Sequence, residues 1–407
     1  FWGVMLICLM LIWLLIGARG RAAQGPAQAK ETGPRMLSPE EHPAAVREVM
    51  DVRIAIQEDG AQSFRGPLRS SAEAVYQRLK QALAPGILPL MREDERFGIN
   101  ILLLPKPAEG EAPEKPVRPW LHWGLFALTA ITTAWAGAAH RGVEVLEDPW
   151  GIQLGLPYAI GLLLILGVHE LGHYFMARRH GMNVTPPYFI PVPFALGTFG
   201  AFIKMKSPPE NRRALFDVAI AGPLAGLAMA IPALLLGLQD SSVALTSTAD
   251  DGFFAGTLVR SSILFGLLAK LSLGDAITYT SVLRLSPLAF AGWLGFFLTA
   301  LNLVPVGQLD GGHIARAVFG GRTGQAISSI GMWSILLLSL FVWPGLMMWA
   351  LIIFFLAGRG APPLNDVTPL SRNRRALGCF AFVILGLILA PMPESFWNFA
   401  RIACPYL

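Results

Sequence analysis

Residues 155–177 form an apolar run long enough to cross a lipid bilayer as one helix, yet this run contains the ionisable side chains His169, Glu170 and His173. Ionisable residues are costly inside a membrane, so those that occur there are usually functional. Residues four apart share one face of a helix, so His169 and His173 can present imidazole nitrogens to one metal ion. Glu170 can then reach a metal-bound water as general base. The alternative is that both histidines are satisfied by packing against a partner helix.

The composition is that of a membrane protein. Of the 407 residues, 54% are hydrophobic and 14% are charged, and the mean hydropathy is +0.52. Soluble proteins carry about 25% charged residues, so the chain is predicted to cross a membrane several times. The net charge of +5 does not indicate nucleic-acid binding, because the basic residues cluster beside apolar runs, as in cytoplasmic loops. The three cysteines lie far apart in sequence and predict neither a disulfide framework nor a metal site.

The predicted fold is mainly α: a polytopic membrane helix bundle with a membrane-associated β-hairpin and a small soluble α/β domain near the N-terminus. Strand-like alternation at 52–57 and 98–104, with helical spacing at 71–84, indicates the α/β domain. It is expected to bind a partner, gate access or serve only as a folded spacer. In chain order we expect an N-terminal transmembrane helix (1–18), a linker (19–44), the α/β domain (45–104), a second linker (105–119), a membrane-embedded domain (120–391) and a C-terminal tail (392–407).

The N-terminal apolar stretch ends at Arg19 and Arg21 without a small-x-small cleavage site, which favours a transmembrane helix over a cleaved signal peptide. The chain begins with Phe1 rather than Met, so the first residues of the protein are expected to be missing.

Six apolar segments follow the second linker, at 120–137, 155–177, 214–238, 286–304, 328–356 and 376–389. The segment 328–356 is too long for one span of about 20 residues, and Pro344 is expected to divide it into a helical hairpin. Arg260 and Lys270 interrupt the segment 253–271, so an amphipathic helix at the interface is favoured over a further span, although a crossing stays open. With this choice every arginine cluster falls on the cytoplasmic side and both acidic loops on the other.

A catalytic zinc ion needs three protein ligands and an open position for water. Glutamate is almost absent downstream of His173, whereas Asp310 directly follows an apolar span, in a segment whose proline and glycine are expected to unwind the helix. Irregular backbone at membrane depth is tolerated only where it is buried in protein or lines a polar cavity. A carboxylate there is expected to meet a cation, so Asp310 is the preferred third ligand. A helix cap is the alternative role for Asp310, and His313 could compete as the ligand.

The two motifs together resemble a known family. The segments His-Glu-Leu-Gly-His at 169–173 and Asn-x-x-Pro-x-Gly-x-Leu-Asp-Gly at 302–311 resemble the site-2 protease family of intramembrane zinc metalloproteases. Within it, the chain looks closest to the chloroplast ethylene-dependent gravitropism-deficient and yellow-green proteins and their bacterial relatives. The segments that carry this closer resemblance are 64–69, 199–203, 221–226, 286–293 and 364–368.

The resemblance implies roles for individual residues. His169, His173 and Asp310 would bind Zn²⁺, Glu170 would be the catalytic acid/base, and Asn302 would lie near the scissile carbonyl. Glu170 would take the proton of the attacking water and give it to the leaving amine, and Asn302 could hydrogen-bond the developing oxyanion. Many family members carry a PDZ domain between the two motifs; this chain has no room for one, which leaves substrate delivery open.

A β-hairpin is predicted over residues 187–206, with prolines on one strand, where they are confined to edges. The other strand could bind an extended substrate by strand addition; a loop that merely covers the site is the alternative. The candidate substrate-binding residues are Phe199, Gly200, Ala201 and Phe202. Gly222 and Gly226, four apart in an apolar span, are expected to let two helices pack closely.

The predicted activity is zinc-dependent intramembrane endopeptidase cleavage, within or near a transmembrane segment of a protein substrate. An inactive metal-binding membrane scaffold or chaperone of the same fold is the alternative from outside the enzymes. A metal transporter would need more polar residues along several spans, and a prenyl-protein type protease would need a downstream glutamate ligand. We expect a multi-pass protein of the bacterial inner membrane with its site toward the cytoplasm, or alternatively of a plastid membrane. The partners expected are the substrate and the bilayer, with no nucleic acid; the oligomeric state and the substrate stay open.

Overall fold

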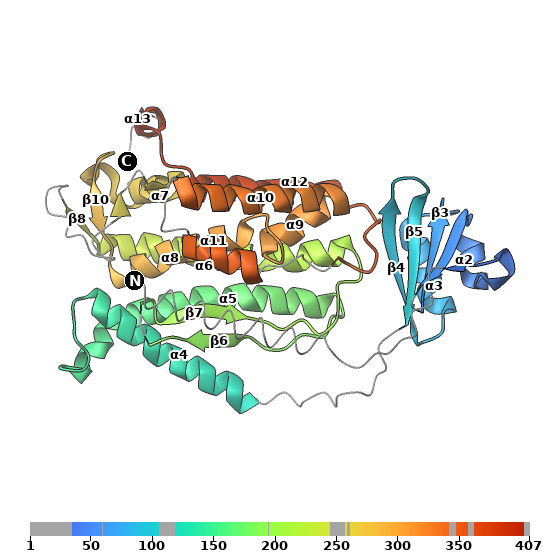
Figure 1. Cartoon of the computed structure of the whole chain (residues 1–407). Helices are drawn as coiled ribbons and strands as arrows, with labels where there is room; N and C mark the ends of the chain where they lie inside the picture. The colour runs from blue at the N-terminus through green and yellow to red at the C-terminus, as the bar shows by residue number, and fades with distance from the viewer. Residues whose placement is uncertain are drawn as a thin grey trace.

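The computed structural model describes residues 35–58, 60–105, 119–193, 195–244, 257–258, 261–341, 347–356 and 362–402. Long helices lie side by side in one body (Figure 1). A five-stranded sheet with its two helices lies beyond one end of this body, and a small three-stranded sheet lies at the other end. The fold is therefore mainly α, as predicted.

The first unit is an antiparallel sheet with the strand order β1-β2-β3-β5-β4. Its strands are β1 (Arg35–Met36), β2 (Ile54–Glu58), β3 (Ala61–Gly66), β4 (Ile87–Asp94) and β5 (Gly98–Pro105), and its helices are α2 (Ala44–Val49) and α3 (Ala72–Ala82), with a 3-10 turn, η1, at Pro39–Glu41. Phe64, Leu79 and Met91 are among the fully buried residues of its core. This unit is called the α/β unit below, and β4 is the edge strand on the side of the helical body.

The helical body and its connections follow in chain order. The helices are α4 (Pro119–His140), α5 (Leu156–Arg179), α6 (Arg212–Gln239), α7 (Ile263–Leu273), α8 (Pro287–Leu303), α9 (Asp310–Phe319), α10 (Gly321–Phe341), α11 (Met347–Leu356), α12 (Arg372–Leu389) and α13 (Glu394–Ile402), with 3-10 turns η2 (Pro149–Gly155) and η5 (Gly274–Ala276). The strands β6 (Tyr188–Pro191) and β7 (Thr198–Phe202) form a hairpin, and β8 (Ser242–Ala244), β9 (Thr257–Leu258) and β10 (Val282–Arg284) form the three-stranded sheet.

By length and composition, three of the described helical stretches could cross a membrane: 149–179, 212–239 and 321–341. The apolar helix α8 is shorter, with 17 residues. Large apolar side chains on the outside of the body, such as Ile160 and Ile330, are 64% and 65% exposed. An apolar outer surface of this kind suits a lipid environment better than water.

Helices α5, α6 and α8 form the centre of the body because small residues let their backbones approach. A Cβ atom added at Gly237 of α6 would lie 2.1 Å from the backbone nitrogen of Ala289 on α8. A Cβ atom at Gly292 of α8 would lie 2.5 Å from the backbone nitrogen of Leu234 on α6. Such contacts are typical of close helix packing in membranes, where interfaces are enriched in small residues.

The basic ends of three helices meet at the end of the body that faces the α/β unit. Asp217 of α6 accepts hydrogen bonds from Nε and Nη2 of Arg374 at 2.7 and 2.8 Å, and its carboxylate lies 3.0 Å from Nε2 of His180. In the same region Nζ of Lys80, on α3, donates to Glu210 at 2.8 Å. The arginine clusters at the end of α5 and at the starts of α6 and α12 thus share one end of the body, as the predicted topology requires.

Several predicted elements correspond to described ones, and others were missed. Strands β2 and β5, helix α3 and the β6–β7 hairpin lie where the sequence pattern predicted them. Strands β3 and β4 were not predicted, since β3 is largely polar and β4 ends in acidic residues; β1 lies in the range expected as linker. Helices α9 and α13 and the three-stranded sheet were missed as well. The predicted helix at 1–18 lies outside the described residues, as do most of 105–119 and the expected break at 343–345.

Candidate metal centre

Helix α5 places both histidines of the motif on its inner face. The side chains of His169 and His173 are 8% and 10% exposed, and Glu170 is buried beside them. The spacing of four residues on a continuous helix brings the two Nε2 atoms to 3.1 Å from each other. The interpretation that these residues share one face of a helix is confirmed.

The interruption of the helix between α8 and α9 sets the position of the Asp310 carboxylate. Helix α8 ends at Leu303 and α9 begins at Asp310, and Gly307 in the connection has a positive φ of 51°. A Cβ atom at Gly311 would lie 1.9 Å from the carbonyl oxygen of Leu303, so only glycine allows α9 to start this close to the end of α8. The predicted unwinding is confirmed. Asp310 is the first residue of α9, where a carboxylate suits the positive end of the helix, but the N-cap position is Leu309 and no described side chain caps it.

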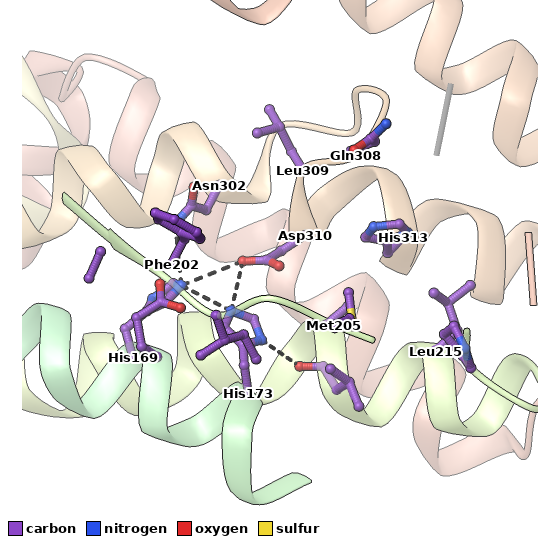
Figure 2. A pocket seen from close by; sticks show the side chains of 16 residues that line it. His169, His173, Phe202, Met205, Leu215, Asn302, Gln308, Leu309, Asp310 and His313 are labelled. Atoms are coloured by element: carbon purple, nitrogen blue, oxygen red, sulfur yellow. Dashed lines mark hydrogen bonds and ion pairs between the residues drawn. The ribbon is translucent and has the colours of Figure 1, made fainter. Parts of the chain in front are cut away.

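Three ligand atoms from these segments converge, as the dashed lines in Figure 2 show. Oδ2 of Asp310 lies 3.6 Å from Nε2 of His169 and 3.3 Å from Nε2 of His173. A tetrahedral zinc ion bound at about 2.0–2.1 Å would hold its ligand atoms about 3.3 Å apart, so the observed spacing fits such an ion. This group of two imidazoles and one carboxylate could hold a metal ion.

Helix α6 orients one imidazole and makes room for both. Nδ1 of His173 is 2.8 Å from the carbonyl oxygen of Val218, which can accept its proton and leave Nε2 free for a metal. A Cβ atom at Gly222 would lie 2.1 Å from Nε2 of His173, and one at Gly226 would lie 3.0 Å from Nδ1 of His169. The glycine pair therefore does provide close packing, and what packs against it is the pair of imidazoles.

A cavity of about 260 Å³ opens over the three ligand atoms. Glu170 and Asn302 line it, and Nδ2 of Asn302 lies 3.3 Å from Nε2 of His169. Ile203, directly after β7, also lines this cavity. His313 also lines this cavity but is not one of the three grouped ligands, and in Figure 2 no dashed line joins it to them.

The hairpin strand lies along a second cavity of about 300 Å³ that shares His169, Glu170 and Asn302 with the first. Phe199, Gly200 and Ala201 line this second cavity, and Ala201 and Phe202 line the first. Side chains of α8 and α11 form its other wall, among them Leu298 and Ile353. All four residues predicted on this strand thus border the space beside the candidate metal centre.

Sequence reasoning missed the contributions of Val218, Gln308 and Leu309, which hold or line the site. The sequence could not predict the role of Val218, because its backbone carbonyl makes the contact and any residue type would supply that group. Gly222 and Gly226 carried a signal, but for helix packing in general.

Comparison with known proteins agrees with this geometry. Residues 157–342 match the model of peptidase family M50. The chain is 29% identical over 360 residues to the probable chloroplastic zinc metalloprotease EGY2 of Arabidopsis thaliana, covering 83% of this chain and 61% of that protein. It is 34% identical over 373 residues to the probable chloroplastic zinc metalloprotease EGY1 of Oryza sativa subsp. japonica, covering 81% and 62%. With the probable chloroplastic zinc metallopeptidase EGY3 of Arabidopsis thaliana, identity is 32% over 360 residues, covering 83% and 61%.

The chain thus spans about three fifths of the length of these relatives. The matched family segment covers α6 and also α5, α8 and α9, which supply His169, His173, Glu170, Asn302 and Asp310. Residues 157–342 thus match the domain of peptidase family M50, the site-2 protease family, and the chain is similar over most of its length to the chloroplast EGY proteins.

Proposed function

We propose that this chain is a zinc-dependent intramembrane endopeptidase that hydrolyses a peptide bond within or near a transmembrane segment of another protein. The observation that carries the proposal is the convergence of His169, His173 and Asp310 beside Glu170, although Asp310 lies 137 residues after His173 in the chain. A structural ion pair would not need a carboxylate, two imidazoles and a further buried carboxylate around one cavity. The relatives named as zinc metalloproteases support zinc as the ion.

In this proposal His169, His173 and Asp310 hold the metal. When bound, zinc supplies a Lewis acid that lowers the pKa of water to about 7. Glu170 takes the proton of the attacking water and later donates it to the leaving amine. Asn302 hydrogen-bonds the oxygen of the scissile carbonyl as negative charge develops on it.

A helical substrate hides its backbone, so cleavage requires a locally extended segment. Strand β7 pairs with β6 along one edge, and the residues of β7 border the second cavity. An extended substrate that adds to the other edge of β7 would satisfy its backbone groups and cross the cavity in front of Glu170. Phe199 and Phe202, which are 57% and 47% exposed, would contact its side chains.

We place the protein in a membrane that it crosses several times, which the long apolar helices support. The chloroplastic names of the relatives favour the plastid membrane over the bacterial inner membrane that the sequence alone suggested. The arginine-rich end of the helices, near the α/β unit, would face the stromal or cytoplasmic side.

Replacement of Glu170 by Gln tests the proposal. The variant keeps all three metal-binding residues, so it is expected to bind zinc at the wild-type level and to lose cleavage by about 10²- to 10⁴-fold, the usual contribution of a general acid/base. Quantitative proteomics of membranes that carry the variant should reveal intact membrane proteins that the wild type removes. An inactive scaffold would give identical membrane proteomes for both forms, and that outcome would contradict the proposal.

A further inference from the structure

A short segment with isolated bridges at Asn365 joins the α/β unit to the helical body. Residues 364–366 lie on the free edge of β4: the N–H of Met91 donates to the carbonyl of Leu364 at 2.8 Å, and the N–H of Asp366 donates to the carbonyl of Met91 at 3.1 Å. On their other side, the N–H groups of Leu364 and Asn365 donate to the carbonyls of Pro209 and Glu210, at 3.0 and 2.8 Å. These residues therefore bridge β4 and the loop that leads into α6.

The apolar side chains of the same segment belong to the α/β unit. Leu364 and Val367 pack, partly buried, against its hydrophobic core. Asn365 is fully buried, and its amide donates to the hydroxyl of Thr368 at 2.7 Å. The segment 364–368, called the bridging segment below, is thus fixed to the α/β unit by its backbone and by its side chains.

One side chain of the bridging segment enters the helical body. Oδ1 of Asp366 accepts a hydrogen bond from Nε of Arg212 at 3.0 Å, and Oδ2 accepts one from Nη2 of Arg316 at 2.6 Å. Asp366 and Arg212 have side chains that are only 4% and 9% exposed. Arg212 also donates to Glu93 of β4 at 3.0 Å, so two cations and two anions form one network. Buried charges are tolerated when they are paired and hydrogen-bonded in this way.

The two arginines stand on the helices that build the metal centre. Arg316 lies on α9, six residues after the ligand Asp310. Arg212 is the first residue of α6, the helix that supplies Val218 and Gly222 to His173. The junction of α9 and α10 leaves space for the carboxylate, since a Cβ atom at Gly321 would lie 2.7 Å from Oδ2 of Asp366.

From this arrangement we propose that Asp366 is a positioning residue for the metal centre: the α/β unit, through the bridging segment, holds α9 against α6 and thereby sets the position of Asp310 relative to the two histidines. The proposal rests on the proposed function, because it takes the group of His169, His173 and Asp310 to be the metal site. Coupling between sites is carried by packed elements and hydrogen-bond networks of this kind. The α/β unit is then part of the apparatus that shapes the active site.

The test uses the full-length chain in detergent, with Asp366→Asn as the main variant and Glu95→Gln as the matched control. Glu95 pairs with Arg322 at 2.7 Å across the same boundary, but both side chains are at least 70% exposed, unlike those of Asp366 and Arg212. Arg316→Lys is the second variant, because it keeps the positive charge and removes the guanidinium whose Nη2 donates to Asp366. It remains informative if Asp366→Asn does not fold.

Two measurements are made on each protein. The first is amide hydrogen exchange of residues 310–319 in metal-free protein, and the second is zinc affinity by competition with a chelator. We expect Asp366→Asn to accelerate exchange in α9 and to weaken zinc binding by roughly 2- to 30-fold, with a smaller change in Arg316→Lys. We expect Glu95→Gln to match the wild type, and exchange in α4 to be unchanged throughout.

The proposal would be overturned if either variant, while folded, showed the same hydrogen exchange in α9 and the same zinc affinity as the wild type. Accelerated exchange that spreads equally to α4 would also overturn it, because it would indicate general destabilisation. If the wild type itself binds no zinc, the proposed function fails, whereas accelerated exchange confined to α9 would still support the mechanical link between Asp366 and that helix.

Discussion

Gly222 of α6 lies so close to His173 of α5 that a Cβ atom at position 222 would be 2.1 Å from the imidazole Nε2. Nε2 is the atom that faces His169 and Asp310, so a methyl group there would enter the space that the metal ligands share. The glycine is thus required by the site as much as by the packing of α5 on α6.

Gly222→Ala is therefore expected to lower zinc affinity by about 10- to 100-fold, the range seen when groups that orient metal ligands are changed. Overpacking of this kind also costs about 1–3 kcal/mol of folding free energy. The measurement is zinc bound per chain after dialysis against a weak chelator. Gly386→Ala in α12 is the control, since a Cβ atom there meets nothing within 4 Å. Equal zinc content in both variants would show that His173 has another way to reach the metal.

Asn302 is expected to contribute to the rate and not to metal binding. Asn302→Ala removes the amide that lies 3.3 Å from Nε2 of His169 and faces the cavity. We expect kcat to fall by about 10²- to 10³-fold, as for loss of one oxyanion donor, with zinc content unchanged. Steady-state kinetics on a cleavable transmembrane peptide, combined with metal analysis, checks this. If the variant instead lost zinc, while the molecules that kept zinc retained the wild-type kcat, the role of Asn302 would be to orient His169.

Phe199, one of two exposed aromatic residues on β7, is expected to bind substrate. Phe199→Ser removes a side chain that is 57% exposed and lines the second cavity. Loss of about half the burial energy of a large apolar side chain corresponds to roughly a tenfold increase in KM. We expect kcat and zinc content to remain at wild-type values. Ile330→Ser on α10, where the side chain is 65% exposed, serves as the control; an equal effect there would point to a general change in the membrane body.

Contact between the α/β unit and the helical body is expected to weaken in acid. Burial opposes ionisation of Glu210, but hydrogen bonds from Lys80 and Gln77 outweigh it and hold the pKa of Glu210 below its ordinary value. A carboxyl whose pKa is lowered on folding contributes stability above its unfolded pKa of about 4.3, and this contribution is lost as the pH falls through the folded pKa. The protection of α3 amides against hydrogen exchange, relative to the intrinsic rate at each pH, should therefore fall below about pH 4 in the wild type. In Glu210→Gln exchange should already be faster at neutral pH, with a weaker pH dependence; an unchanged pH dependence would contradict this account.

The features that depend on neighbouring residues could be predicted from the sequence. Helix periodicity places His169 and His173 on one face of α5. Proline and glycine, which act within a few residues, predict the unwinding before Asp310 and the β6–β7 hairpin. The preference for Asp310 over His313 agrees with the described geometry. That preference came from the free-energy cost of burying a carboxylate at membrane depth, which is avoided when the carboxylate binds a cation.

What the sequence did not predict depends on contacts between distant segments. Residues 364–366 pair with β4, and Asp366 is buried between Arg212 and Arg316. Asp366 and Arg212 are 154 positions apart in the chain, so no local pattern predicts their contact. Strand β4 was missed because three of its eight residues are charged, and one of them, Glu93, pairs with Arg212 of the neighbouring body. Helix α9 was missed because its first three residues, Asp310, Gly311 and Gly312, predict a turn when read without their packing against α8.

Zinc content of the purified full-length chain, measured for the wild type, Asp310→Ala and His313→Ala side by side, tests the central claim most directly. Asp310 is one of the three converging ligands, whereas His313 lines the same cavity without joining them. The account predicts about one zinc ion per chain in the wild type and in His313→Ala, as expected for a single three-ligand site, and little zinc in Asp310→Ala. Full zinc retention in Asp310→Ala, with loss in His313→Ala, would contradict it.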